Sequence, residues 1–412
     1  MAVLLGVASL LLSSCSIVSG SSTTSSPPVP TSPYSRYLAG EQKAVSTALA
    51  SVHVNLPRST GQPAPPLPAG AFGAGVGSHT VLGFLPSWQL PNVANVDYSA
   101  LSEIGYAAVD VEPHGTILHS GAGWTALANG SVAPMVSDAH AHGVRALLTL
   151  FTQTQSTLQQ ISNDPASAGA GLADRAAALM RTNGFDGVDL DLEGQLASAR
   201  HGFVGFVAAF SKRLRAIDPS WTIVLNTFPQ SAVDPESFFD VKALSPYVDQ
   251  LFVMAYDMTD LQVPGATAPL EGADLSDASS LASYVATVPP SKVILGIPFY
   301  GYDFTASRAT PPSATVGSPY AVTYAAVVAA GRPSLWDPTT ETPFQSFKRG
   351  GHWHQTWCDD PTSVALKVAL AAAFKIGGVG AWELGMAYGQ TSMTTALDGG
   401  SPPRRLPLAT QP

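Results

Sequence analysis

The sequence predicts an α/β fold in which eight parallel strands and their connecting helices close into a (β/α)8 TIM barrel. Three observations lead to this prediction. The chain has 412 residues, which suits one barrel with appendages. Hydrophobic residues make up 45% of the chain and charged residues 12%, so a large core can be buried. From residue 81 to residue 398, short apolar runs rich in β-formers alternate with longer Ala-rich stretches of helical spacing.

Each predicted strand is a short apolar run that precedes a helical stretch. The strands are expected at residues 81–85, 106–111, 144–151, 187–192, 222–226, 249–254, 292–297 and 378–382. Helices are expected at residues 132–142, 166–182, 203–216, 275–286 and 363–375. About 80 residues separate the last two strands, which predicts a small insertion around residues 320–358 at one wall of the barrel mouth. In such a barrel the chemistry is expected at the C-terminal ends of the strands.

The segments that flank the predicted barrel, residues 79–398, differ from it in composition. Residues 1–15 form a short apolar run that predicts a signal peptide. Its end, Leu12-Ser13-Ser14-Cys15, resembles the lipobox of bacterial lipoproteins, which implies lipidation of Cys15 and anchoring at the extracytoplasmic face of a bacterial membrane. Residues 16–78, rich in Ser, Thr, Pro and Gly, predict a linker with a short helix near residues 41–52. Residues 399–412, rich in Pro, are predicted to form a disordered tail.

Charge and cysteine content narrow the classes of partner. The 20 Lys and Arg against 29 Asp and Glu give a formal charge of −9 without a basic stripe, which argues against nucleic acid. The two cysteines, Cys15 and Cys358, form neither a disulfide framework nor a metal-binding spacing. No phosphate-binding glycine loop or Gly-x-Ser-x-Gly elbow is found. We therefore expect no cofactor and no metal, a membrane contact through the lipid only, and a monomer.

The fourth predicted strand carries the most informative pattern in the chain. Asp189, Asp191 and Glu193 alternate with Val and Leu, so the three carboxylates share one face of the strand. Side chains two residues apart lie roughly 6.5–7 Å apart along a strand, so three acids in a confined site cannot all be cheaply ionised. At least one is expected to hold a proton near neutral pH. The outermost, Glu193, is best placed to act as a general acid on a ligand.

Two other interpretations of these carboxylates are a calcium site and a solvated edge strand. Acids at alternate positions bind calcium in EF-hand loops, but Gly187 precedes the acids instead of falling within the loop pattern. A solvated edge strand is the second alternative. It fits poorly, because the intervening Val and Leu predict a strand buried on both faces, where charges have no structural reason to be.

This stretch resembles the signature of the family 18 glycoside hydrolases, the chitinase-type barrels. Their motif Asp-x-x-Asp-x-Asp-x-Glu is filled by Asp186, Asp189, Asp191 and Glu193. Further matching pieces follow in the family's order: Gly83-Phe84-Leu85-Pro86-Ser87-Trp88, Met254-Ala255-Tyr256-Asp257, Leu295-Gly296-Ile297-Pro298-Phe299-Tyr300-Gly301 and Gly380-Ala381-Trp382-Glu383. Within the family, the chain most resembles the bacterial branch of spore-cortex and cell-wall hydrolases. The matching pieces are Trp336-Asp337-Pro338, Pro343-Phe344 and Trp357-Cys358-Asp359-Asp360.

The resemblance implies a role for each candidate residue. In the family the substrate's own acetamido oxygen attacks the anomeric carbon, so configuration is retained without an enzyme nucleophile. Glu193 would be the acid and then the base, Asp191 would orient the acetamide and stabilise the cationic intermediate, and Asp189 would tune the shared proton. Tyr256 would align the acetamide oxygen. Substrate contacts would come from Asp257, Trp382, Trp88, Tyr300 and Tyr302, with ordinary core packing as the alternative for the Tyr256–Asp257 pair and for Trp382.

One element of the family is missing from the third predicted strand. The third strand of the family usually carries Ser-x-Gly-Gly, whereas this chain continues Leu147-Leu148-Thr149-Leu150-Phe151-Thr152, so the support beneath the acids is expected to differ.

The leading hypothesis is a retaining, substrate-assisted hydrolase of β-linked N-acetylglucosamine glycans, either chitin oligosaccharides or peptidoglycan strands, at the cell surface. The alternatives are a non-catalytic chitinase-like carbohydrate-binding protein and an endo-β-N-acetylglucosaminidase that acts on N-glycans.

Overall fold

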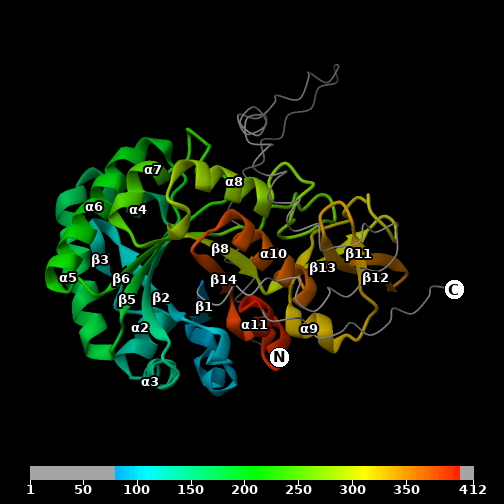
Figure 1. Cartoon of the computed structure of the whole chain (residues 1–412), viewed down its shortest axis with the longest axis horizontal. Helices are drawn as coiled ribbons and strands as arrows, with labels where there is room; N and C mark the ends of the chain where they lie inside the picture. The colour runs from blue at the N-terminus through cyan, green and yellow to red at the C-terminus, as the bar shows by residue number, and fades with distance from the viewer. Residues whose placement is uncertain (1–78, 400–412) are drawn as a thin grey trace.

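The computed structural model describes residues 79–399, and its central feature is a closed barrel of eight parallel strands (Figure 1). The barrel strands are β1 (Thr80–Pro86), β2 (Glu103–Glu112), β4 (Arg145–Thr152), β5 (Gly187–Leu192), β6 (Thr222–Thr227), β7 (Gln250–Val253), β8 (Val293–Pro298) and β14 (Gly378–Trp382). They neighbour one another in the order β1-β14-β8-β7-β6-β5-β4-β2, and β1 also pairs with β2, which closes the ring. The prediction of a (β/α)8 barrel is confirmed, with every predicted strand present.

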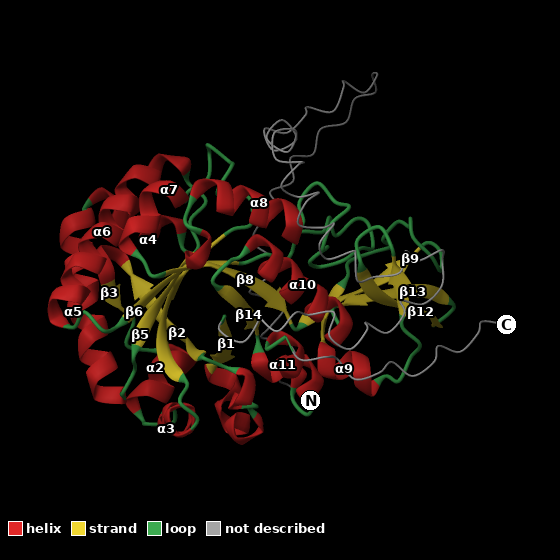
Figure 2. Cartoon of the chain, viewed as in Figure 1, coloured by secondary structure: helices red, strands yellow, loops and turns green. Residues whose placement is uncertain are grey.

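Helices surround the strands, as Figure 2 shows in red around yellow. They are α2 (Gly121–Ala128), α3 (Ala133–Ala141), α4 (Gln155–Asn163), α5 (Pro165–Asn183), α6 (Arg200–Ile217), α7 (Val241–Leu244), α8 (Asp277–Thr287), α10 (Pro361–Phe374) and α11 (Thr391–Leu397). The connection from β1 to β2 instead contains the short 3-10 helices η1 (Ser87–Asn95) and η2 (Tyr98–Ala100). None of the helices within residues 79–399 is long and apolar enough to cross a membrane.

Local sequence signals explain where α8 and α10 begin. Asp360 caps α10 by accepting hydrogen bonds from the backbone of Thr362 and Ser363, and the Ser363 side chain bonds back to Asp360. Pro361 occupies the first helical position, where its missing N–H costs nothing. The Ser276 and Ser279 side chains form the same reciprocal arrangement at the start of α8.

The insertion between β8 and β14 is larger than the sequence predicted. It begins at Tyr300 rather than Tyr320, because β9 (Tyr300–Ala306) follows β8 almost directly. β9 joins β10 (Tyr320–Thr323), β11 (Leu335–Asp337), β12 (Thr342–Arg349) and β13 (His352–Cys358) in an antiparallel sheet of order β10-β9-β13-β12-β11, with α9 (Tyr324–Ala329) beside it. In Figure 1 this sheet extends to one side of the barrel.

Two apolar layers enclose the barrel strands. Outward-facing side chains such as Val188, Leu190 and Leu192 pack with the helices in the main core. Inside the barrel lies a smaller cluster: Leu82, Phe84, Leu147, Val224, Phe252, Met254 and Ile294. This inner cluster excludes water from the lower part of the barrel, so any carboxylate above it faces a medium of low dielectric constant.

Several predictions fall outside the described residues. These are the signal peptide of residues 1–15 with its lipidation site at Cys15, the linker of residues 16–78 with its short helix, and the tail except for residue 399. They remain predictions from sequence.

Candidate active site

β5 carries the predicted row of acids on its inner face. Asp189 is fully buried, Asp191 is 7% exposed, and Glu193, just beyond the strand, is half-buried. Exposure therefore increases toward the C-terminal end of the strand, which is the end where a barrel of this type presents its chemistry. The structure places the outermost acid where a ligand can reach it and the innermost where none can.

The environment of Asp191 and Glu193 gives the two carboxyl groups different pKa values. Burial, with the negative charges of Asp191 and Asp257, raises the pKa of Glu193 to about 8. Burial raises the pKa of Asp191 to about 6, an effect opposed by a hydrogen bond from Asn226. At pH 7 Glu193 therefore holds its proton while Asp191 is mostly ionised. A neutral acid beside an anion is the pairing that general acid catalysis with charge stabilisation requires.

Asp189 is held from two neighbouring strands. The Asn226 amide on β6 donates to Asp189 Oδ2 at 3.3 Å. Thr149 on β4 lies directly opposite Asp189 in register, and its hydroxyl lowers the pKa of this acid. Burial and the nearby Asp191 nevertheless raise the pKa of Asp189 well above its ordinary value. Thr149 thus supplies a hydroxyl beneath the acids, although the Ser-x-Gly-Gly element is missing.

The first acid of the motif has a different position. Asp186 lies before β5, on the opposite end of the strand from Glu193, where its Oδ2 accepts from the backbone of Ala146 and bonds His140 Nε2, both at 2.8 Å. The backbone carbonyl of Asp186 also accepts from Thr222. Asp186 therefore fastens β5 between its neighbours and takes no part in the site.

Backbone contacts fix the position of Glu193. Its N–H donates to Thr152 O at 2.9 Å, and its carbonyl accepts from Gln155 Nε2 at 3.0 Å. The next residue, Gly194, packs against the Phe238 ring so closely that an added Cβ would lie 2.3 Å from the ring carbons. Only glycine lets the chain pass the ring here, and this passage sets the direction in which Glu193 leaves the strand.

Tyr256 and Asp257 follow β7 and lie beside the acids. Tyr256 is half-buried, and burial together with the charges of Asp191 and Glu193 raises the pKa of its phenol well above 10. It is therefore a permanent hydrogen-bond donor. Asp257 has a left-handed backbone (φ 56°) and accepts a 2.9 Å hydrogen bond from the Tyr302 hydroxyl.

Tyr300 and Tyr302 occupy buried positions on β9, at 3% and 7% exposure. Their rings pack at 6.0 Å, and Tyr300 lies 6.2 Å from the Tyr256 ring. With Phe304, Phe344 and Trp357 they form an aromatic cluster that also touches Trp382. The structure thus uses both tyrosines to hold the Tyr256–Asp257 pair from the insertion side.

The two tryptophans expected to contact substrate lie at neighbouring strand ends. Trp382 ends β14, is half-buried and packs at 5.8 Å on Phe84 of the inner cluster. Trp88 lies on η1 with 47% of its surface exposed. Gln89 links these two segments, because its Nε2 donates to the buried Glu383 Oε1 at 2.9 Å. Gly385 N donates to the other carboxylate oxygen at 2.8 Å.

The sequence did not predict the roles of two residues, Asn226 and Thr149, or the link between Gln89 and Glu383. Asn226 was recognisable only as a polar residue within a predicted strand, and Thr149 only as a hydroxyl in a largely apolar one. The link from Gln89 to Glu383 joins residues 294 positions apart and has no local signal. No cluster of three or more His, Cys, Asp or Glu suited to a metal ion is found in residues 79–399.

Comparison with known proteins places this geometry in context. The family described as Glycosyl hydrolases family 18 matches the chain over residues 81–387. The putative sporulation-specific glycosylase YdhD of Bacillus subtilis is 26% identical over 63% of this chain, which matches 64% of that protein's length. Human di-N-acetylchitobiase is 24% identical over 60% of this chain and 68% of its own. A family 18 chitinase from Cycas revoluta, solved with (GlcNAc)3, superposes with a TM-score of 0.69 at 20% identity, covering 77% of this chain and 98% of the plant protein.

Proposed function

This chain belongs to family 18 of the glycosyl hydrolases, and from that premise we propose that it hydrolyses glycans of β-linked N-acetylglucosamine with retention of configuration. One observation carries the proposal: a protonated Glu193 with a pKa of about 8 stands two residues from Asp191, whose pKa of about 6 leaves it ionised at neutral pH. The names of the chitobiase and chitinase relatives support N-acetylglucosamine as the sugar.

In the first step, Glu193 donates its proton to the glycosidic oxygen as the bond from that oxygen to the anomeric carbon breaks. The acetamido oxygen of the same sugar forms the new bond to the anomeric carbon. The resulting ring is cationic, and the carboxylate of Asp191 stabilises it while accepting from the acetamide N–H. The Tyr256 phenol, which stays protonated, donates to the acetamido oxygen and aligns it for attack.

In the second step, Glu193 acts as the base. Its carboxylate takes a proton from a water molecule, the water oxygen bonds to the anomeric carbon, and the acetamide is released unchanged. Two displacements at one carbon retain the configuration. The indole of Trp382 supplies an apolar floor for the sugar ring, and the aromatic cluster of the insertion packs against Trp382.

Two measurements test this proposal. Chitin oligosaccharides should be cleaved with the β-anomer as the first product seen by NMR, and a thiazoline mimic of the cyclised intermediate should inhibit. Cello-oligosaccharides have the same backbone without the acetamide, so they should be inert. Turnover of cello-oligosaccharides at a comparable rate, or an α-anomer as the first product, would contradict the mechanism.

We also propose that the protein is exported and held at the bacterial surface by a lipid on Cys15. The lipobox-like ending Leu12-Ser13-Ser14-Cys15 and the linker-like composition of residues 16–78 support this placement. A tethered enzyme on a linker would act on peptidoglycan strands or on captured oligosaccharides near the membrane.

A further inference from the structure

The ladder that joins β14 to β1 ends just before Trp382. The last pair in this parallel ladder is Gly83 with Ala381. On the other side, Trp382 still pairs in register with Pro298 of β8, and its carbonyl accepts from the backbone N–H of Phe299 at 2.7 Å. Main-chain hydrogen bonds therefore hold Trp382 toward β8, whereas its support on the β1 side comes from side chains.

One hydrogen bond between side chains crosses to the β1 side. Gln89 lies on η1, which follows β1, and Glu383 directly follows Trp382. The Nε2 atom of Gln89 donates to Glu383 Oε1 at 2.9 Å, and the backbone N–H of Gly385 donates to Oε2 at 2.8 Å. Glu383 is completely buried, and both of its carboxylate oxygens have a donor. The segments that follow β1 and β14 are thus joined at the residue next to Trp382.

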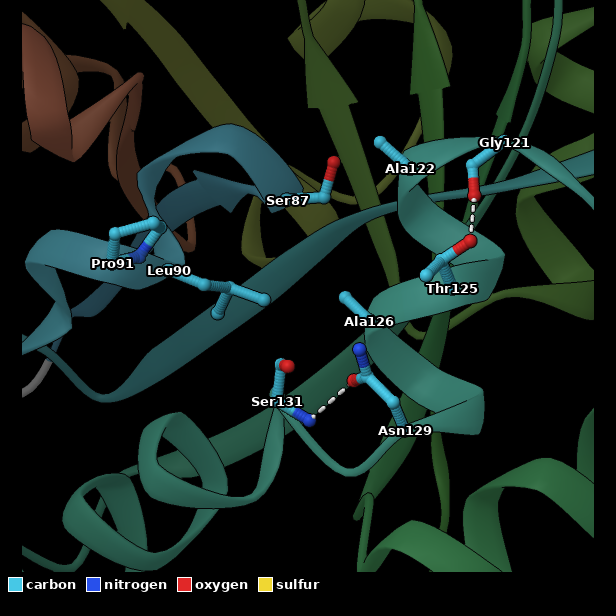
Figure 3. A pocket seen from close by; sticks show the side chains of 9 residues that line it. All are labelled: Ser87, Leu90, Pro91, Gly121, Ala122, Thr125, Ala126, Asn129 and Ser131. Atoms are coloured by element: carbon cyan, nitrogen blue, oxygen red, sulfur yellow. Dashed lines mark hydrogen bonds between the residues drawn. The ribbon is translucent and has the colours of Figure 1, made fainter.

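The surroundings of Gln89 keep its amide beside Glu383. A Cβ on Gly385 would lie 2.3 Å from Gln89 Cδ, so any side chain there would displace the amide. On another side, η1 borders a pocket of about 640 Å³ that lies between it and α2 and is lined on the η1 side by residues such as Ser87 and Pro91 (Figure 3). Packing leaves that side of η1 open, so the position of η1 relative to β14 depends on the contact at Gln89.

Glu383 is not among the charges that act on the catalytic acid. Those that raise the pKa of Glu193 belong to Asp191 and Asp257. Burial raises the pKa of Glu383 itself to about 7, and its two hydrogen bonds oppose this rise. An influence of Glu383 on the reaction is therefore expected through the residues that it holds, and Trp382 is its direct neighbour in the chain.

The indole of Trp382 lies between two apolar clusters. Its ring is 5.8 Å from that of Phe84 in the inner cluster, and it also packs against the aromatic cluster of the insertion. Met386 of η7 (Leu384–Ala387), the segment that Glu383 caps, packs against the same aromatic cluster. A displacement of Glu383 would therefore shift both the indole and η7.

We propose that Glu383 is a positioning residue for the hydrolysis proposed above, and that its hydrogen bond with Gln89 fixes the Trp382 indole as the floor for the sugar ring. The inference rests on the proposed function. Loss of the hydrogen bond leaves the acid in place but lets the indole tilt, so the sugar is bound less tightly and less often in the reactive orientation.

A double-mutant cycle tests whether Gln89 and Glu383 act through Trp382. Gln89→Leu removes the donor, and Trp382→Ala removes the indole that the hydrogen bond is proposed to fix. The kcat/KM on the N-acetylglucosamine hexamer is measured for each variant and for the double variant. Gln159→Leu is the matched control, because Gln159 is half-buried on α4 and its amide donates to Asn163 of the same helix at 2.9 Å.

Gln89→Leu should lower kcat/KM about 10- to 100-fold in the parent protein, which is the effect of losing a hydrogen bond to a charged group. Gln159→Leu should leave it unchanged. In the Trp382→Ala background, Gln89→Leu should change kcat/KM by less than about 2-fold, because the indole is no longer there to be positioned. If Trp382→Ala leaves no measurable turnover, the same cycle is read from the dissociation constant of the hexamer by isothermal titration calorimetry. Equal effects in the two backgrounds would overturn the role, since the pair would then stabilise the fold without acting through Trp382.

An exchange of the two side chains separates this role from a loss of folding. Gln89→Glu places two carboxyl groups face to face and should lower kcat/KM as Gln89→Leu does. Adding Glu383→Gln to it restores an amide donor opposite a carboxylate, so kcat/KM should return toward that of the parent. A double exchange that is folded by circular dichroism but regains no activity would contradict the role of the hydrogen bond. A parent protein that cleaves no N-acetylglucosamine oligomer would instead overturn the proposed function, and this role with it.

Discussion

The Tyr302 hydroxyl donates a 2.9 Å hydrogen bond to Asp257 and so joins the insertion to the barrel. Tyr302 is the third residue of β9, while Asp257 follows β7 at the barrel mouth. Burial raises the pKa of Asp257, and the hydrogen bonds from Tyr300 and Tyr302 oppose this rise; the negative charge of Asp257 in turn contributes to the raised pKa of Glu193. Tyr300 and Tyr302 of the insertion therefore both reach the surroundings of Glu193, the proposed acid, through Asp257.

Tyr302→Phe tests this relationship. The variant keeps the ring and its packing but removes the donor to Asp257, so kcat/KM should fall about 10-fold or more, as expected for a hydrogen bond to a charged group. Steady-state kinetics with a chitin oligosaccharide, alongside circular dichroism to verify folding, measures this. Tyr247→Phe is the control: it removes the hydroxyl of an exposed tyrosine outside the site, so its kcat/KM should be unchanged. Equal rates in the two variants would show that Tyr302 only packs.

Glu193→Gln should separate binding from turnover. The amide keeps the size of the acid but cannot donate a catalytic proton, so kcat should fall by roughly 10²–10⁴-fold. Oligosaccharide binding should survive, and isothermal titration calorimetry on the purified variant measures it. Full activity in Glu193→Gln would show that Glu193 is not the acid. Loss of both binding and activity would indicate misfolding, and Asp191→Asn, which also exchanges a carboxylate for an amide of the same size, would then be measured in its place.

The pH dependence of kcat/KM should be bell-shaped. Activity should rise as the cluster ionises near pH 6 and fall as the pH passes about 8, because Glu193 then loses the proton it must donate. Because Asp191 and Glu193 interact, the two apparent pKa values of the profile belong to the pair and not to either residue alone. In Asp191→Asn the negative neighbour is gone, so the pKa of Glu193 should fall and the basic limb should move to lower pH. A basic limb that stays in place would mean that Asp191 does not influence the acid.

Lys367 should be essential for stability. Its ammonium lies fully buried between Asp277 and Asp359, bonds the first and stands 3.6 Å from the second, and also donates to the carbonyl of Ala268. Lys367→Met leaves two buried carboxylates without a counter-charge, which should cost about 3–5 kcal/mol in the free energy of unfolding. Urea denaturation measures it. Arg213→Met, which breaks the exposed pair with Asp174, is the control and should cost less than about 1 kcal/mol.

Cys15→Ala should release the protein from the membrane fraction, because a lipid on Cys15 is the only anchor that the sequence predicts. Cell fractionation with immunoblotting measures the distribution. Cys358→Ala is the matched control, since this buried thiol lies within the folded domain and cannot carry a lipid there. Membrane association that persists in Cys15→Ala would refute the lipobox interpretation.

The barrel and the row of acids follow from the amino-acid sequence alone. Eight strands were recognisable because each is a short apolar run, and Asp189, Asp191 and Glu193 had to share one face because side chains alternate along a strand. Which acid keeps its proton depends on tertiary packing, since burial, Asp191 and Asp257, which follows another strand, together raise the pKa of Glu193. The tertiary structure likewise brings Asn226 to Asp189 and starts the insertion at Tyr300. These properties arise between residues far apart in the chain, where the free energy depends on distance and dielectric surroundings that no local pattern contains.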